Sequence, residues 1–234
     1  MIIVLLHWTG SLCSQVLQND IVIVNVGFEQ RYDILKAVVL VAEQSPLAIG
    51  VNVQMRKAQD VDTILLNNKV ETPIIFLNNL SNGLALVGAT FDSLYATGYG
   101  NFYSDGDKIV YAIANFPNNG VFYDSFSSSI VGAVDKKKLD DFTGKIKIQL
   151  SESDVNASVI PMKKLFDSNK LFLNSLNGKI VVFGYLGNSS NTASQCFPTK
   201  SDEDLFNVEL VDADKQCFVY STVIQAYLIR KGLE

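Results

Sequence analysis

The chain has 234 residues, a net charge of −5 and 48% apolar residues, while only 18% of its residues are charged. Its mean hydropathy is +0.19, yet no stretch approaches the roughly 20 consecutive apolar residues that a membrane helix needs. These numbers exclude a disordered chain, a coiled coil and a polytopic membrane protein. The acidic balance also argues against nucleic acid as a partner, because binding to phosphates depends on dense lysine and arginine.

The residues that most often carry chemistry are scarce. The sequence holds one histidine, His7, and three cysteines, Cys13, Cys196 and Cys217. No two cysteines have C-x-x-C spacing, so no metal site is predicted, and a single histidine disfavours Ser-His-Asp and Cys-His mechanisms. Cys196 and Cys217 lie in the same C-terminal stretch and could pair if the domain is exported. Free buried thiols are the alternative.

The N-terminal half alternates between strand and helix patterns. Residues 1–19 begin apolar and carry no charge, and they are either the end of a membrane helix or a first buried strand. The run 20–26 is nearly continuous in β-branched residues, which is typical of a strand buried on both faces. Apolar residues at helical spacing then predict a helix over 31–45. A second buried strand is predicted over 47–53.

This alternation continues with a helix over 60–68, which has Asp60 or Asp62 as its N-cap, and a strand over 73–77. The order β-α-β-α-β predicts right-handed crossovers and a parallel sheet covered by helices. Turn-linked strands are predicted over 83–113, with Asp105-Gly106 as a hairpin turn.

The C-terminal half is less regular. Apolar patterns predict helices over 121–138, 161–169 and 218–231, an alternating strand over 145–150 and a buried strand over 180–184. The segment Gly184-Tyr-Leu-Gly187 lacks the spacing of glycine-rich nucleotide loops, so no cofactor is predicted. Since no linker is visible, we expect 20–234 to form one α/β domain of three layers. A mostly parallel central sheet would have helices on both faces and some antiparallel additions.

A candidate binding site follows from this topology, because ligands of open α/β sheets bind beyond the carboxyl ends of the strands. Uncharged amides and one cation gather there in the sequence, and we predict that they bind a polar ligand, with Arg31 contacting an anionic group. This set suits recognition more than proton transfer, so no catalytic residue is predicted. The alternative is that the asparagines only cap helices and satisfy turns. The candidate residues are Asn25, Arg31, Asn52, Gln54, Asn78 and Asn188.

Several segments together resemble a known family. The run DIVIVNVG over 20–27 is followed by Arg31 and by SPLAIGVN over 45–52, while NGKIVVFG over 177–184 and VYSTVIQAYL over 219–228 come near the end. This order resembles CHASE2, an extracytoplasmic sensory domain of bacterial membrane-bound signalling proteins, over nearly the whole chain. The chain departs from the family where Asn52 replaces the usual Asp and where Tyr220-Ser221-Thr222 replaces His-Ala-Asn.

The resemblance implies a domain without catalytic activity that binds a small molecule outside the cytoplasm. Membrane helices absent from this chain would flank it, with 1–6 as the outer end of one anchor and Arg230-Lys231 at a membrane boundary. Two other functions stay open. One is a stand-alone hydrolase or transferase that uses carboxylates. The other is an interaction domain, whose homodimer face on the closing helix would contain Phe218, Val223, Ile224, Tyr227 and Leu228.

Overall fold

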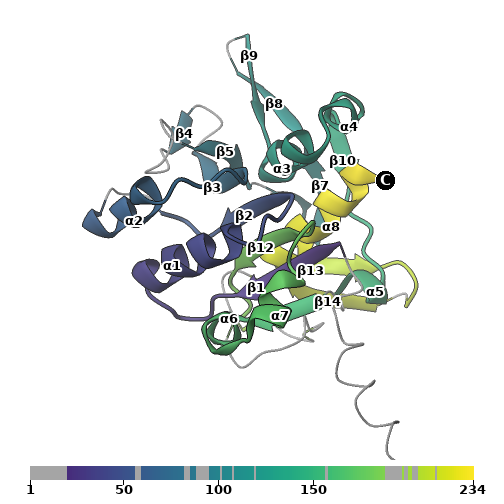
Figure 1. Ribbon diagram of the computed structural model, residues 1–234. Coiled ribbons are helices and arrows are strands. Elements are labelled where there is room, and N and C mark those ends of the chain that lie inside the picture. The colour runs from purple at the N-terminus through teal and green to yellow at the C-terminus, as the bar shows by residue number, and fades with distance from the viewer. Residues whose placement is uncertain are drawn as a thin grey trace, which may run out of the picture.

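The structure is a computed structural model in which a central sheet lies between layers of helices (Figure 1). Residues 1–19 lie outside the part of the chain that it describes. The described residues are 20–55, 59–81, 85–87, 95–100, 102–106, 108–118, 120–155, 158–187, 197, 200–201, 205–213 and 215–234.

The central sheet has seven strands, and all of its neighbours are parallel except β4 (Ala85–Val87), which is antiparallel to β3. The strands β1, β2 and β12 are buried at every residue, which explains their continuous apolar sequences. The predicted parallel α/β fold is therefore confirmed. The parallel strands in spatial order are β11 (Ser158–Pro161), β1 (Ile21–Asn25), β12 (Ile180–Gly184), β2 (Ala48–Asn52), β3 (Ile74–Ser81) and β5 (Ala96–Tyr99).

One face of this sheet is covered by four helices. Leu35 of α1, Leu65 of α2 and Met162 of α6 share a hydrophobic core with Val22 of β1 and Phe183 of β12. Alternate residues of the same strands point to the other face, as strand geometry requires. The helices are α1 (Arg31–Ala42), α2 (Thr63–Asn67), which follows the 3-10 turn η1 (Asp60–Asp62), α6 (Met162–Asp167) and α7 (Lys170–Asn174).

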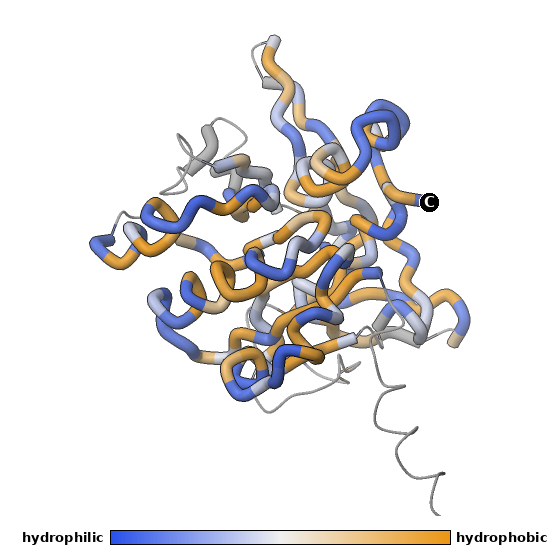
Figure 2. Tube along the Cα trace, viewed as in Figure 1, coloured by the Kyte–Doolittle hydropathy of each residue, from blue (hydrophilic) through white to orange (hydrophobic). Residues whose placement is uncertain are grey.

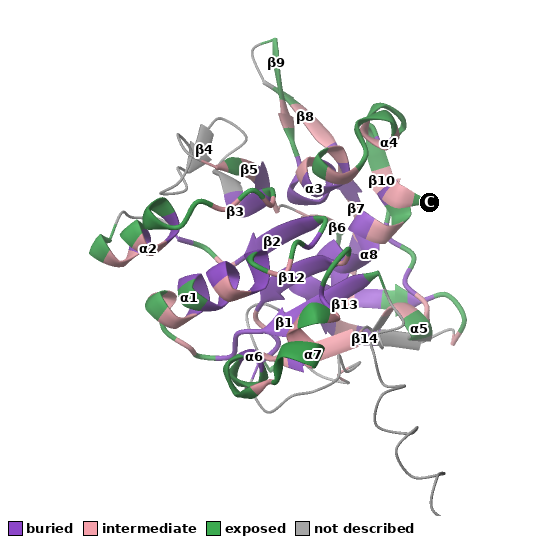
Figure 3. Ribbon diagram, viewed as in Figure 1, coloured by how far each residue is buried: buried purple, intermediate pink, exposed green. Residues whose placement is uncertain are grey.

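The opposite face packs against α3 (Phe126–Val134) and α8 (Ser221–Leu233). Every residue of α8 from Thr222 to Ile229 is buried (Figure 3). The same core contains Ile23 and Val182 of the central sheet and Val208 and Val219 of a second sheet. Helix α8 therefore lies between two sheets, and this is why it has no polar face over these turns.

The second sheet has five strands and is mostly antiparallel. Its β6–β7 hairpin turns one position later than the predicted Asp105-Gly106: Asp105 ends β6 and pairs with Lys108, and Gly106, with a φ of 62°, follows it in the turn. A separate hairpin of β8 (Asn115–Asn118) and β9 (Val121–Asp124) projects from the body (Figure 1). The remaining helices of the described chain are α4 (Lys136–Asp141) and α5 (Glu152–Val155). The five strands are β6 (Phe102–Asp105), β7 (Lys108–Ile113), β10 (Lys145–Lys147), β13 (Leu205–Leu210) and β14 (Lys215–Tyr220).

Two predicted helices begin too early. The helix expected over 121–138 starts at Phe126, because Ser125 accepts a hydrogen bond from the backbone N–H of Ser128 and caps it. Before it lies strand β9, and Asp135 separates α3 from α4. The closing helix starts at Ser221, and the preceding residues form β14, which pairs with β13.

The apolar residues follow the central strands and the inner sides of the helices (Figure 2). In the part of the chain that the structure describes, no helix is long and apolar enough to cross a membrane.

We predict that the buried side chains of α8 contribute far more to the free energy of unfolding than exposed side chains elsewhere do. Ile224 is fully buried, whereas Leu171 of α7 is 76% exposed. Ile224→Ala should lower the free energy of unfolding by about 2–5 kcal/mol, because it leaves a cavity between the sheets. The control Leu171→Ala should change it by less than about 0.5 kcal/mol. Urea denaturation measures both, and equal effects would contradict the packing described for α8.

Candidate functional site

Asn25, Asn52 and Asn78 gather at one edge of the central sheet. Asn25 pairs with Gly184, which pairs with Asn52, so these three residues form one row at the carboxyl ends of β1, β12 and β2. Asn78 lies on the neighbouring strand β3. All three asparagines are buried. The sequence thus predicted their common location, and the partners of Asn25 and Asn52 show what those two amides do there.

Asn25 holds two turns together. Its Oδ1 accepts hydrogen bonds from the backbone N–H groups of Gly27, at 3.0 Å, and of Leu186, at 3.1 Å. Gly27 has a φ of 53°, so the chain turns sharply after β1. The amide therefore satisfies backbone donors of the loops that follow β1 and β12, as expected of an asparagine in a turn.

Asn52 binds the first turn of α8. Its Nδ2 donates to Thr222 Oγ1 at 2.9 Å and to Ser221 Oγ at 3.4 Å. Thr222 Oγ1 also donates to the backbone oxygen of Tyr185 at 3.3 Å. A Cβ at Gly184 would lie 2.3 Å from Thr222 Oγ1, so only glycine permits this approach. The start of α8 is thus seated directly on the ends of β12 and β2.

Arg31 opens α1 and forms an ion pair across to η1. Its Nη2 donates to Asp62 Oδ2 at 2.7 Å, and the two side chains are only 13% and 8% exposed. Asp62 Oδ2 also accepts from the backbone N–H of Gln59 at 3.0 Å. This carboxylate occupies the position beside Arg31 where an anionic ligand was predicted, and it was considered in the sequence only as an N-cap.

The remaining predicted residues are less informative. Gln54 follows β2 and is exposed, while Asn188 lies outside the described residues. The sequence reasoning missed Gln225, a glutamine of α8 that is 2% exposed and lies beside Gly100. Its Oε1 is buried without a hydrogen-bond partner in the described structure. A polar residue among apolar residues at 223–229 was the signal for it.

A row of aromatic rings borders the same edge. Phe28, which is 80% exposed, packs edge-on against Tyr185 with ring centroids 5.4 Å apart. Tyr185 then contacts Tyr220 at 5.6 Å, and Tyr220 contacts Phe197 at 5.6 Å. Sequence reasoning noted Tyr220 as a departure from the CHASE2 pattern but did not predict that these rings meet, because they come from four separate parts of the chain. Together they form an apolar rim beside the amide row.

The chemistry available at this edge is hydrogen bonding rather than proton transfer. Amides and hydroxyls supply most of its polar groups, and the carboxylate of Asp62 is held by Arg31. Burial raises the pKa of the Tyr99 hydroxyl, which donates to the backbone oxygen of Ile113 at 2.6 Å. Among the described residues, no group of three histidine, cysteine or acidic side chains could hold a metal ion.

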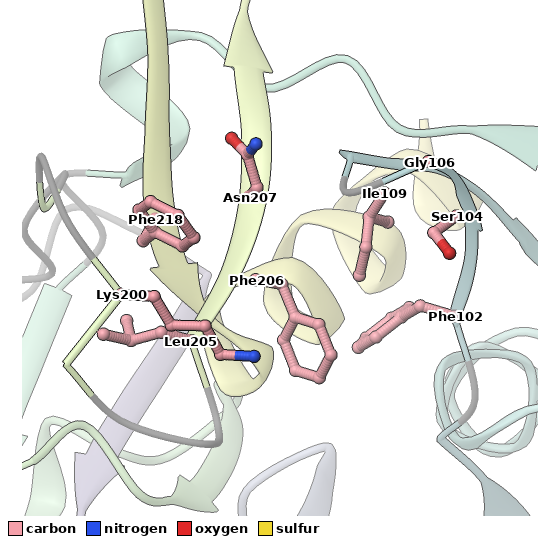
Figure 4. A pocket seen from close by; sticks show the side chains of 9 residues that line it. All are labelled: Phe102, Ser104, Gly106, Ile109, Lys200, Leu205, Phe206, Asn207 and Phe218. Atoms are coloured by element: carbon pink, nitrogen blue, oxygen red, sulfur yellow. The ribbon is translucent and has the colours of Figure 1, made fainter.

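The described residues line two open cavities at the second sheet, among others in the molecule. One, of about 390 Å³, is lined from β6, β7, β13 and β14 (Figure 4). The other, of about 590 Å³, lies beside the last turn of α8, where Arg230 forms an ion pair with Asp154 at 2.8 Å.

We predict that Arg31 and Asp62 stabilise the fold as a pair. Arg31→Met alone should lower the free energy of unfolding by about 3–5 kcal/mol, because it leaves a carboxylate buried without its cation. Adding Asp62→Leu should recover most of that loss. Chemical denaturation of the single and double variants measures the coupling. Simple additivity of the two losses would show that the ion pair is not what joins α1 to η1.

Comparison of the chain with models of protein families, with curated proteins and with solved structures found no significant match.

Proposed function

We propose that the chain is a non-catalytic, extracytoplasmic ligand-sensing domain of a bacterial membrane-bound signalling protein, as its resemblance to CHASE2 implies. The observation that carries this proposal is the position of α8. The helix starts on the row of amides at the strand ends and passes between the two sheets to residue 233. A change at either sheet would therefore be transmitted along one buried helix.

The contacts at the two ends of α8 support this role. At its start, Thr222 bonds Asn52 and touches Gly184, so strands β2 and β12 both position the first turn. At its end, Arg230 pairs with Asp154. Since a close-packed interior does not deform gradually, a shift of the first turn would move the helix as a unit.

The state of one cysteine supports the extracytoplasmic location. Cys217 is 2% exposed and disulfide-bonded, and stable disulfides are typical of oxidising compartments outside the cytoplasm. Its partner is one of the other two cysteines, Cys13 and Cys196, which both lie outside the described residues. An extracytoplasmic location is therefore part of the proposal, together with membrane helices that flank this chain.

A homodimer remains part of the proposal, but through another surface. Val223, Ile224 and Leu228 of the closing helix, which were predicted to form a dimer face, are at most 1% exposed because they pack in the core of this chain. Exposed apolar side chains elsewhere, such as Phe122 on the projecting hairpin, are free of that constraint.

We expect the disulfide to join Cys196 to Cys217. Phe197 pairs with Phe218 in antiparallel fashion, with both backbone hydrogen bonds formed, and each cysteine directly precedes one of these phenylalanines. The pairing of the two phenylalanines therefore brings together the two segments of the sequence that carry these cysteines. Peptide mapping without reduction should recover a Cys196–Cys217 peptide that dithiothreitol abolishes. A Cys13–Cys217 peptide, or a free Cys217 in protein exported to the periplasm, would contradict this pairing.

The proposed function is tested by the gene that encodes the chain. Sequencing through both of its ends should reveal an apolar membrane helix before the first residue or after the last one, and an output domain such as a kinase or cyclase. Such segments are what a membrane-bound sensor requires to transmit its signal. A reading frame without a membrane helix on either side would overturn the proposal. Turnover of an ester, phosphate or glycoside, abolished by one Asp or Glu substitution, would do the same.

A further inference from the structure

The smaller cavity lies where the second sheet opens. Among the described residues, strands β7 and β13 share a single registered pair, Lys108 with Asn207. Within the same part of the chain, β6 pairs with β7 and not with β13. The gap between β6 and β13 holds a cavity of about 390 Å³ (Figure 4). This volume is at the small end of the range for sites that bind small molecules.

The walls of this cavity are mainly apolar. Phe102 of β6 and Phe206 of β13 are in edge-to-face contact on one wall, with ring centroids 5.5 Å apart and ring planes at 74° (Figure 4). Ile109, Leu205 and Phe218 complete the apolar lining. Rings and branched chains of this kind favour a ligand with an aromatic or branched aliphatic body.

The polar lining is small and carries a positive charge. Lys200 is the one charged side chain among the described residues of the lining, and its amine points toward Phe206 (Figure 4). Nearby, Lys108 and Glu209 form an ion pair with each other, and Asp105 lies exposed at the hairpin turn. Glu209 is thus already matched by a cation, whereas Lys200 has no ion-pair partner in the described structure. An anionic group on a ligand would supply one.

Two neutral groups stand on opposite walls. Ser104 extends from β6, and the amide of Asn207 extends from β13 (Figure 4). The Asn207 Oδ1 is buried without a hydrogen-bond partner in the described structure. A buried polar atom without a partner is unfavourable, so this wall is polar beyond what the fold itself satisfies.

From these observations we propose that the cavity binds a small carboxylate with an aromatic or branched aliphatic body, its carboxylate on Lys200 and its body against the paired rings of Phe102 and Phe206. Identifying this molecule as the sensed ligand rests on the proposed function, while the binding rests on the cavity alone. Phe218 lies on β14, which leads through Tyr220 directly into α8. Occupancy of the cavity therefore acts on the strand that positions the start of α8.

The test uses 3-phenylpropanoate as the probe and its neutral analogue 3-phenylpropanamide as the control. Backbone amide chemical shifts of the oxidised, full chain are followed during titration with each compound. We expect the carboxylate to bind roughly tenfold more tightly than the amide, because a charge-assisted hydrogen bond is lost in the latter. The shifts should concentrate at Phe102, Leu205 and Phe206. Failure of the carboxylate to bind at millimolar concentration, or equal affinity for both compounds, would overturn the proposal.

Variants of the protein separate the contribution of the ligand's charge to binding from the contribution of its apolar body. Lys200→Met should lower the affinity for the carboxylate roughly tenfold and leave the affinity for the amide unchanged. The matched control Lys170→Met removes an exposed lysine of α7 on the opposite face of the central sheet and should change neither affinity. Phe206→Leu should lower the affinity for both compounds, since it removes a ring that both contact. Normal binding by Lys200→Met would overturn the assignment of the anion contact.

The location of the shifts distinguishes this proposal from the proposed function. Probe-induced shifts at Asn25, Asn52 and Thr222 alone would overturn the cavity as the site and still support a sensing domain that binds at the strand ends. Binding in the cavity by a chain whose gene encodes no membrane helix would support the cavity and overturn the sensor.

Discussion

The complete burial of α8 is the constraint on which the two-sheet arrangement depends. From Thr222 to Ile229 the helix has no side that faces solvent, so apolar surface must be supplied from two directions. The central sheet supplies it through alternate residues of β1 and β12, and the second sheet supplies it through β13 and β14. Each fully buried Ile or Leu contributes about 1.5–3 kcal/mol relative to an exposed one. The second sheet is thus part of the core rather than an appendage.

The same constraint shapes the polar edge of the sheet. A helix that enters the core brings unsatisfied backbone and side-chain groups at its first turn, and a buried polar group is costly unless it is hydrogen-bonded. Asn52, Ser221 and Thr222 satisfy one another there, and Asn25 satisfies the adjacent loops. The first role of these asparagines is therefore to stabilise the fold. A ligand at this edge would compete with the seating of α8, and this competition is what a sensor would use.

Local patterns in the sequence predict those parts of the fold that depend on local physics. Runs such as 20–26 indicate burial on both faces, and Asp105-Gly106 indicates a tight turn, because each property depends on adjacent residues. The starts of two helices were harder to predict, since hydrophobicity alone is consistent with either a strand or a helix over Val121 to Tyr123 and over Cys217 to Tyr220. Strand pairing decides between the two, and pairing depends on distant segments.

The same limit applies to the candidate site. That Asn25 and Asn52 share an edge follows from parallel topology, which the alternation of elements predicts. Their partners do not follow, because Asn52 meets Thr222 across 170 positions and Arg31 meets Asp62 across 31. The sequence did not predict the cavity for a similar reason, since Phe102 and Phe206 belong to β6 and β13, which are not paired with each other among the described residues. Distant contacts of this kind carry both the proposed signalling route and the proposed ligand pocket.

The central claim is that α8 is fixed by both sheets at once and moves only as a unit. Native-state hydrogen exchange of its amides tests this directly. If the claim holds, the amides of residues 225–229 exchange only through global unfolding, and their protection equals that of β1 and β12. They would then also share one denaturant dependence. Exchange of these amides at a lower free energy than β1, through local opening of the helix, would contradict the claim.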